Sequence, residues 1–237
     1  MAERDKPGLS LDPRYRASSC ECNCYIMDGM LPTVADIMAL HKKYAPSDEV
    51  YNLVFMHCQI VYDIAVQLIE KSSLPVDREL VKTGALLHDI GVYPLFGADG
   101  KLREGVNYIT HGTEGEKILK EEGFPEAIWR FAAHHTGVGL SKQDVIKQKL
   151  PLPIADYQAK SDEELLIMYT DKFHSKTSPP YFNSYEWYRL DIAKFGEDKV
   201  NKFEHMAKKF GIPDLEPFSH KYSFVIREVP SLLLDEL

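Results

Sequence analysis

From about residue 31 to residue 176, apolar side chains recur at helical spacing in one segment after another. Each such segment buries one face, and little sequence is left between the segments for strands. No similarity recurs at a fixed period of the kind that solenoid proteins show. We therefore expect an all-α core, built as a helical bundle.

The expected helices carry their own start and stop signals. Residues 48–70 follow Ser47, whose side chain suits an N-cap. Ser161, with Glu164 three residues later, predicts a capping box at the start of a helix that runs to about residue 175. Further helices are expected at residues 32–44, 79–88, 113–122, 126–135 and 197–210.

The sequence divides into three parts. Residues 1–30 are rich in Arg, Ser, Pro and Asp without sustained periodicity, and we interpret them as an N-terminal arm. Residues 31–176 form the helical core. Residues 177–237 form an extension with an aromatic-rich stretch and further helices, which we expect to pack on the core. Pairing of this extension with a second copy of the chain, in a homo-oligomer, stays open.

Charge and hydropathy narrow the classes of partner. Lys and Arg number 28 against 36 Asp and Glu, a formal net charge of −8, which disfavours broad binding to duplex nucleic acid or to an anionic membrane. The polar N-terminus lacks the apolar core of a secretory signal, and no apolar run approaches the roughly 18 residues of a membrane span. We therefore expect a cytoplasmic protein.

Three of the four cysteines, Cys20, Cys22 and Cys24, alternate within the arm. Neighbours so close make a poor disulfide framework, so we interpret them as reduced thiols. A redox or metal-handling role for them stays open.

Histidine placement is the most informative feature of the sequence. Of the 9 histidines, five lie on or at the ends of four successive helical segments. An aspartate directly follows the second of these histidines, and another aspartate lies on a fifth segment. The set is His57, His88, Asp89, His111, His134, His135 and Asp171.

Two members of this set are placed where a bound cation would help. His57 lies in the middle of the apolar stripe that includes Val54 and Val61, so its ring points into the core, where a polar group needs a partner. Asp89 lies at the C-terminal end of a helix, where the helix dipole disfavours a carboxylate and a cation would offset it. Imidazoles and carboxylates without a thiolate suit Fe or Mn in a two-metal site better than structural zinc.

The order His…His-Asp…His…His-His…Asp resembles the HD superfamily of metal-dependent phosphohydrolases, in particular its binuclear members. The resemblance covers about residues 47–176 and implies an HD-domain helical bundle, here with extra C-terminal helices. It also implies two divalent metal ions. By this resemblance, the first ion is held by His57, His88, Asp89 and Asp171. The second is held by Asp89, as a bridge, with His111, His134 and His135.

The resemblance implies hydrolysis of a phosphomonoester or phosphodiester, with a nucleotide-like small molecule as substrate and metal-activated water as nucleophile. Cyclic-dinucleotide phosphodiesterases of the GYP type carry Lys shortly after His-Asp-Ile-Gly, whereas Val92 follows here, so the chain departs from that type. Asp89 is the expected catalytic carboxylate. Lys172, His174 and Lys176 follow Asp171 and are candidates for phosphate contact or leaving-group protonation, with Lys172 and His174 assigned as catalytic.

Two other classes of function stay open. The HD superfamily includes di-iron oxygenases that look alike at the ligands, and substrate-dependent oxygen uptake would distinguish them. A non-catalytic binding protein that kept the helical fold is the second alternative. The full ligand set disfavours it, because a scaffold has no physical need for seven convergent metal-binding groups.

Overall fold

The computed structural model describes residues 31–229. Within them the chain forms ten α-helices, four short 3-10 helices and one small three-stranded sheet, so the expected helical fold class is confirmed. The arm and its cysteines Cys20, Cys22 and Cys24 lie outside the described residues.

The helices of the first half follow one another closely, as expected from the sequence. Three helices precede the first 3-10 turn: α1 Val34–Tyr44, α2 Asp48–Ser72 and α3 Arg78–Leu87. The following elements are η1 Ile90–Leu95, η2 Tyr108–Thr110, α4 His111–Glu121, α5 Glu126–His134, α6 Lys142–Lys147 and α7 Asp162–Thr170.

The second half combines helices with the sheet that the sequence did not predict. Its elements are η3 Asp171–Phe173, β1 His174–Ser175, β2 Tyr181–Asn183, α8 Tyr185–Ile192, η4 Ala193–Phe195, α9 Glu197–Phe210, α10 Glu216–Tyr222 and β3 Ile226–Arg227. The strand order is β1-β2-β3, with β1 antiparallel and β3 parallel to β2. Strands of two or three residues are too short to show a period of two, which is why sequence patterning missed them.

The start of α7 differs from the expected capping box. The Ser161 hydroxyl accepts a hydrogen bond from Glu164 N, as predicted. The Glu164 carboxylate, however, accepts from Lys160 N and from the buried Arg130 guanidinium instead of returning to the cap. The helix ends at Thr170, earlier than the predicted residue 175, because the chain tightens into η3 and then extends as β1.

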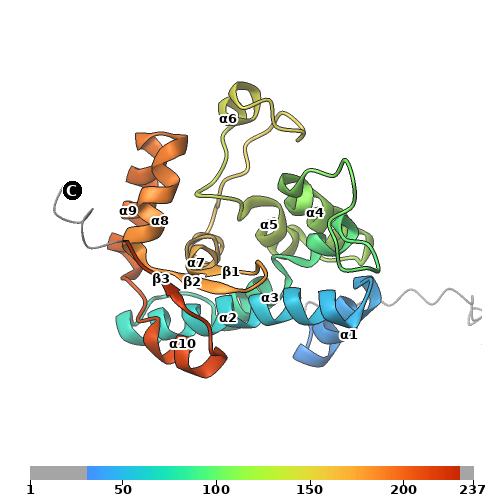
Figure 1. The fold of residues 1–237 in the computed structure, drawn as a ribbon, viewed down its shortest axis with the longest axis horizontal. Coiled ribbons are helices and arrows are strands. Elements are labelled where there is room, and N and C mark those ends of the chain that lie inside the picture. Colours follow the sequence, from blue (N-terminus) through green and yellow to red (C-terminus); the bar gives the residue numbers. More distant parts are fainter. Residues whose placement is uncertain (1–30, 230–237) are drawn as a thin grey trace, which may run out of the picture.

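Helix α2 runs along one side of the molecule, and several other helices pack against it (Figure 1). Its 25 residues are long and apolar enough to cross a membrane by length and composition, which corrects the expectation that no segment approaches this limit. Half of its most apolar window is buried inside the protein, and core helices pass the same test.

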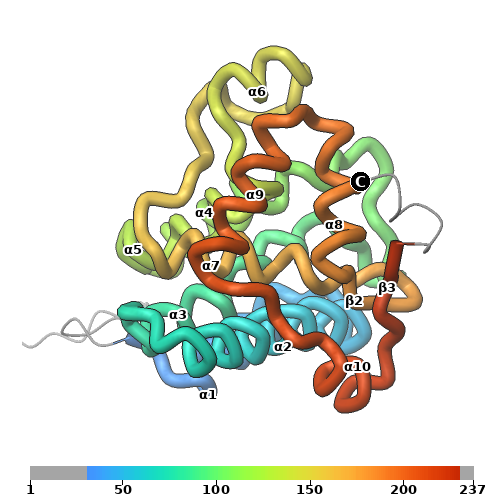
Figure 2. The backbone as a smooth tube through the Cα atoms, turned by 90° about the vertical axis from the view of Figure 1, so that its left-hand side faces the viewer, coloured from blue at the N-terminus to red at the C-terminus, as the bar shows by residue number. Residues whose placement is uncertain are grey.

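The extension shares a buried core with the helices before it. Phe182, Phe203 and Phe210 are fully buried in one cluster with residues of α2 and α7 such as Ile64 and Met168. Figures 1 and 2 show α8 and α9 side by side at one end, while α6 and its flanking loops project from the rest.

A close backbone crossing fixes η1 against α4. A Cβ atom added to Gly91 would lie 2.0 Å from the His111 carbonyl oxygen and 2.1 Å from Gly115 N. Only glycine leaves room for this approach. The crossing brings the segment that follows Asp89 directly against the first turn of α4, which begins at His111.

Candidate metal centre

Six of the seven predicted ligands converge in the interior. They come from the middle of α2, the end of α3, the start of α4, and the residues that follow α5 and α7. All are buried except one carboxylate, which is partly exposed at the edge of a cavity. The six are His57, His88, Asp89, His111, His135 and Asp171.

Asp89 lies between two groups of imidazoles. Its Oδ2 lies 3.2 Å from His57 Nε2 and 3.7 Å from His88 Nε2. Its Oδ1 lies 3.5 Å from His135 Nε2 and 3.7 Å from His111 Nε2. The two oxygens of one carboxylate therefore face two separate sets of nitrogen atoms.

Asp171 completes the first of these sets. Its Oδ1 lies 2.9 Å from His57 Nε2 and 3.5 Å from His88 Nε2. The remaining oxygen, Oδ2, accepts a hydrogen bond of 2.6 Å from Lys172 Nζ. One oxygen is thus directed at the imidazoles, and the other is held by a lysine.

Backbone carbonyls fix the tautomers of three of the histidines. His88, His111 and His135 each have Nδ1 close to a carbonyl oxygen three residues earlier, at 2.7, 2.7 and 2.9 Å. A carbonyl oxygen only accepts, so Nδ1 carries a proton in each ring, and Nε2 presents a lone pair whenever the ring is neutral. This pattern of support is usual for metal-binding imidazoles.

In the neutral rings of His111 and His135 the two Nε2 lone pairs face one another 2.9 Å apart, with no hydrogen atom between them. His57 Nε2 lies 3.3 Å from His88 Nε2 and 2.9 Å from Asp171 Oδ1. Asp89 Oδ1 is buried without a hydrogen-bond partner, and Asp89 Oδ2 lies 2.5 Å from the Lys176 ammonium. Ligand atoms that each lie about 2.1 Å from one ion lie roughly 3 Å apart. The six side chains therefore fit divalent metal ions.

Burial and charge favour the metal-binding form of three of these groups and oppose it in one. Burial alone would lower the pKa of His88, but Cys58, Asp89 and Asp171 outweigh it, so this pKa lies well above its usual range and a metal ion would have to displace the Nε2 proton. Burial lowers the pKa of His111 to about 3, and burial likewise lowers the pKa of His135. Burial alone would raise the pKa of Asp89, but Lys176 and His88 outweigh it, so this pKa lies well below its usual range. Neutral imidazoles and an ionised carboxylate are the forms that bind metal.

The seventh predicted ligand, His134, is not brought to this cluster. Its Nδ1 lies 2.8 Å from the Gln158 carbonyl oxygen, and its ring meets the Tyr157 ring edge-on at 5.9 Å. Consecutive residues at a helix end diverge by about 100°, so only one of two adjacent rings points inward. Here that ring is His135, and His134 lines a different cavity.

The predicted catalytic residue His174 contacts one of the converging histidines. Its Nδ1 lies 2.8 Å from His57 Nδ1, and the two rings stack. If His57 Nε2 binds an ion, its Nδ1 must carry the proton and would donate this bond. Burial and the neighbouring His57 and Lys176 lower the pKa of His174 to about 2. The ring is thus neutral and placed to orient His57.

The predicted catalytic residue Lys172 is buried, and its ammonium is already held. It donates to Asp171 Oδ2 and, over 3.0 Å, to the His135 carbonyl oxygen. Lys172 therefore ties together the segments that carry two of the ligands.

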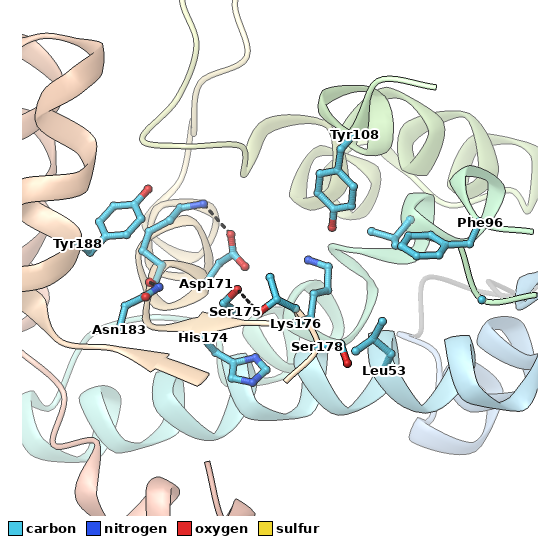
Figure 3. Close-up of a pocket in the computed structure, with 14 residues that line it drawn as sticks. Leu53, Phe96, Tyr108, Asp171, His174, Ser175, Lys176, Ser178, Asn183 and Tyr188 are labelled. Atoms are coloured by element: carbon cyan, nitrogen blue, oxygen red, sulfur yellow. Dashed lines mark hydrogen bonds and ion pairs between the residues drawn. The ribbon is translucent and has the colours of Figure 1, made fainter. Parts of the chain in front are cut away.

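A cavity of about 650 Å³ opens beside the cluster (Figure 3). Apolar and aromatic side chains line part of it, and Asp171 and Lys176 line its inner wall. Sequence reasoning gave no role to Tyr108 or Asn183, which also line it. Tyr108 lies three residues before the predicted ligand His111, and this proximity could have pointed to it. Asn183 belongs to the extension, where the sequence offered no such signal.

The chain matches the model of a protein family. The HD domain matches residues 54–176, more than half of the chain, and this range contains all six converging side chains.

Three curated proteins of archaea are similar in sequence. An uncharacterised protein of Methanocaldococcus jannaschii is 36% identical over 66% of this chain and 78% of its own length. A tRNA (cytidine(56)-2'-O)-methyltransferase of Picrophilus torridus is 34% identical over 54% of this chain and 33% of its own length. The enzyme of the same name from Thermoplasma volcanium is 31% identical over 60% of this chain and 36% of its own length. The chain thus spans about a third of each methyltransferase.

Among solved structures, the HD domain of the phosphodiesterase PgpH from Listeria monocytogenes is similar. The match to the structure of its complex with cyclic-di-AMP covers 72% of this chain and 93% of that domain, with a TM-score of 0.41 and 17% sequence identity. A second structure of the same domain gives a TM-score of 0.43 and 14% identity.

Proposed function

Because the chain belongs to the HD-domain family of metal-dependent phosphohydrolases, we propose that it hydrolyses a phosphomonoester or phosphodiester of a nucleotide-like small molecule. We further propose that two divalent ions, Fe or Mn, are held by the six converging side chains. The observation that carries the proposal is the position of Asp89, whose two oxygens face two sets of imidazole Nε2 atoms.

The charge of the cluster favours an anionic substrate. Two carboxylates, Asp89 and Asp171, are already matched by two ammonium groups, Lys176 at 2.5 Å and Lys172 at 2.6 Å. Once the imidazoles are neutral, as metal binding requires, divalent ions would therefore bring positive charge that these carboxylates do not fully compensate. A phosphate group in the adjoining cavity supplies the missing negative charge.

The cavity suits the rest of a nucleotide. Its volume of about 650 Å³ lies within the range of small-molecule sites. Leu53, Val92 and Phe96 form apolar wall beside the cluster, where a nucleobase loses contact with water. Asn183 Oδ1 is a buried acceptor without a partner, and a substrate hydroxyl or amino group would satisfy it.

The side chains divide the work of such a reaction. Bound divalent ions supply acidity to water and positive charge to the phosphoryl oxygens. Asp89 links the two halves of the ligand set. The backbone carbonyls and His174 hold the imidazole rings in their binding orientation, and Lys172 fixes Asp171. The apolar walls exclude water around the substrate.

The experiment is a hydrolysis panel with protein loaded with Mn²⁺ or Fe²⁺, covering nucleoside monophosphates, cyclic nucleotides and linear dinucleotides. We expect release of phosphate or of a nucleotide, and its loss in Asp89→Ala. Asp63→Ala is the matched control, because Asp63 pairs with Lys221 on the surface, away from the cluster. Fully loaded wild-type protein that is inactive across the panel, or that consumes oxygen with substrate, would argue against a hydrolase.

A further inference from the structure

Lys176 lies at the junction of the ligand cluster and the cavity. Its Nζ lies 2.5 Å from Asp89 Oδ2 and 5.5 Å from the centre of the Tyr108 ring. The side chain is 17% exposed and lines the cavity. Figure 3 shows Lys176 and Tyr108 pointing toward one another from opposite walls.

The anion that holds Lys176 is also required by the metal ligands. Asp89 Oδ2, which contacts the ammonium, is the same oxygen that faces His57 Nε2 at 3.2 Å. A divalent ion held by these two groups would draw on the carboxylate charge and repel an adjacent ammonium. Lys176 would then be a largely buried cation without an anion, which is costly. It therefore needs a second anion when the cluster holds metal.

The other lysine of the cluster has no such need. Lys172 contacts Asp171 Oδ2, whereas Asp171 Oδ1 is the atom that faces the imidazoles. Lys172 also donates to the His135 carbonyl oxygen, which no ligand atom competes for. Lys176 therefore differs from Lys172 in its anion. Its ammonium contacts a carboxylate oxygen that the imidazoles also face, and the side chain borders the open cavity.

We propose that Lys176 binds a non-bridging oxygen of the substrate's phosphate group in the metal-loaded protein. This assignment rests on the proposed phosphohydrolase function. The ammonium stays charged throughout, so it adds positive charge beside the phosphoryl group and transfers no proton. The sequence had named Lys176, Lys172 and His174 together as candidates for phosphate contact and gave the catalytic roles to Lys172 and His174; the contacts in the structure single out Lys176.

Binding of inorganic phosphate to Mn²⁺-loaded protein, measured by isothermal titration calorimetry, tests the proposal without turnover. We expect Lys176→Met to weaken phosphate binding roughly 10- to 100-fold, as expected for one charge-assisted hydrogen bond. Lys176→Arg keeps the charge and should stay within a few-fold of wild type. The matched control is Lys221→Met, which removes a lysine paired with Asp63 at 2.6 Å on the surface and should leave phosphate binding unchanged.

The Mn²⁺ content of each variant is measured beside the affinity. Lys176→Met is expected to keep its metal, because the proposal gives this side chain no part in holding the ions. Where Lys176→Met failed to fold or to load, the ratio of phosphate affinities between Lys176→Arg and Lys176→Gln would decide the same question.

The outcomes separate this proposal from the general one. Wild type that binds phosphate and hydrolyses a panel substrate, with unchanged phosphate affinity and KM in Lys176→Met, would overturn only the role of Lys176. Loaded wild type that neither binds phosphate nor hydrolyses any substrate would overturn both. A raised KM in Lys176→Met, with metal retained, supports the assignment.

Discussion

At the scale of single residues, the cluster depends on where each ring nitrogen keeps its proton. In His88, His111 and His135 the Nδ1–H group donates to the backbone carbonyl three residues earlier, which turns Nε2 toward Asp89. The tautomer is thus set by backbone geometry at a helix end and does not depend on a distant partner. Such rings are oriented for metal before an ion arrives.

Adjacent histidines should therefore behave differently. The His135→Ala variant should lose most of the bound metal, because in the wild type His135 Nε2 lies 3.5 Å from Asp89 Oδ1. His134→Ala should retain its metal, because its ring bonds Gln158 instead. Elemental analysis of both variants, purified without chelator, measures the difference. Equal metal loss in both would mean that the pair acts together, as the sequence-based ligand set had it.

A histidine outside the cluster makes stability depend on pH. His41 is fully buried, with Nδ1 2.7 Å from the Tyr93 hydroxyl and Nε2 2.7 Å from the Leu86 carbonyl oxygen. Burial lowers its pKa from 6.5 to about 4. Between these values the unfolded chain binds a proton that the folded protein does not. Stability is therefore lost as the pH falls from 6.5 to 4, on the order of 3 kcal/mol in total.

Urea unfolding of metal-free wild type and His41→Gln, at pH 7 and at pH 5, tests this effect. The variant should be less stable at pH 7, yet it should lose less stability on acidification than wild type, by roughly 2 kcal/mol. The contributions of the remaining titrating groups cancel in this comparison. Parallel losses in the two proteins would show that His41 does not carry the effect.

At the scale of elements, the contact between η1 and α4 sets the distance between Asp89 and His111. The Gly91 backbone lies against the first turn of α4, and Gly115 in turn approaches Ala132 of α5, where an added Cβ would lie 2.8 Å from the Ala132 Cβ. Two glycines thus hold three ligand-bearing segments at close range. The sequence showed these glycines but not which element each one faces.

Gly91→Ala should accordingly disturb both stability and the metal centre. The new Cβ would meet backbone atoms at 2.0 and 2.1 Å, which cannot move without shifting α4, so we expect a loss of at least about 3 kcal/mol. Denaturant unfolding and Mn²⁺ affinity are the measurements. Gly105→Ala is the control: its φ is +75° with open space around it, so about 1 kcal/mol is expected. Similar losses in the two variants would contradict the close crossing.

At the scale of the whole molecule, the helical core and the convergence of six of the seven predicted ligands were largely predictable from sequence. A histidine within an apolar stripe, as at His57, has few stable environments, and this made the pattern informative. Two outcomes lay beyond the pattern. One is the end of α7 at Thr170. Because the helix ends there, Lys172 turns inward and Lys176 reaches the cavity. The aromatic residues of the extension, such as Phe203, join the core only through tertiary packing.

The proposed activity depends on metal binding by side chains drawn from five parts of the fold. Titration of chelator-treated protein with Mn²⁺, followed by electron paramagnetic resonance of the free ion, measures it most directly. We expect two Mn²⁺ ions per chain in wild type and loss of both sites in Asp89→Ala, because each carboxylate oxygen faces one set of nitrogens. Wild-type protein that binds no Mn²⁺, or Asp89→Ala that binds it as wild type does, would contradict the account.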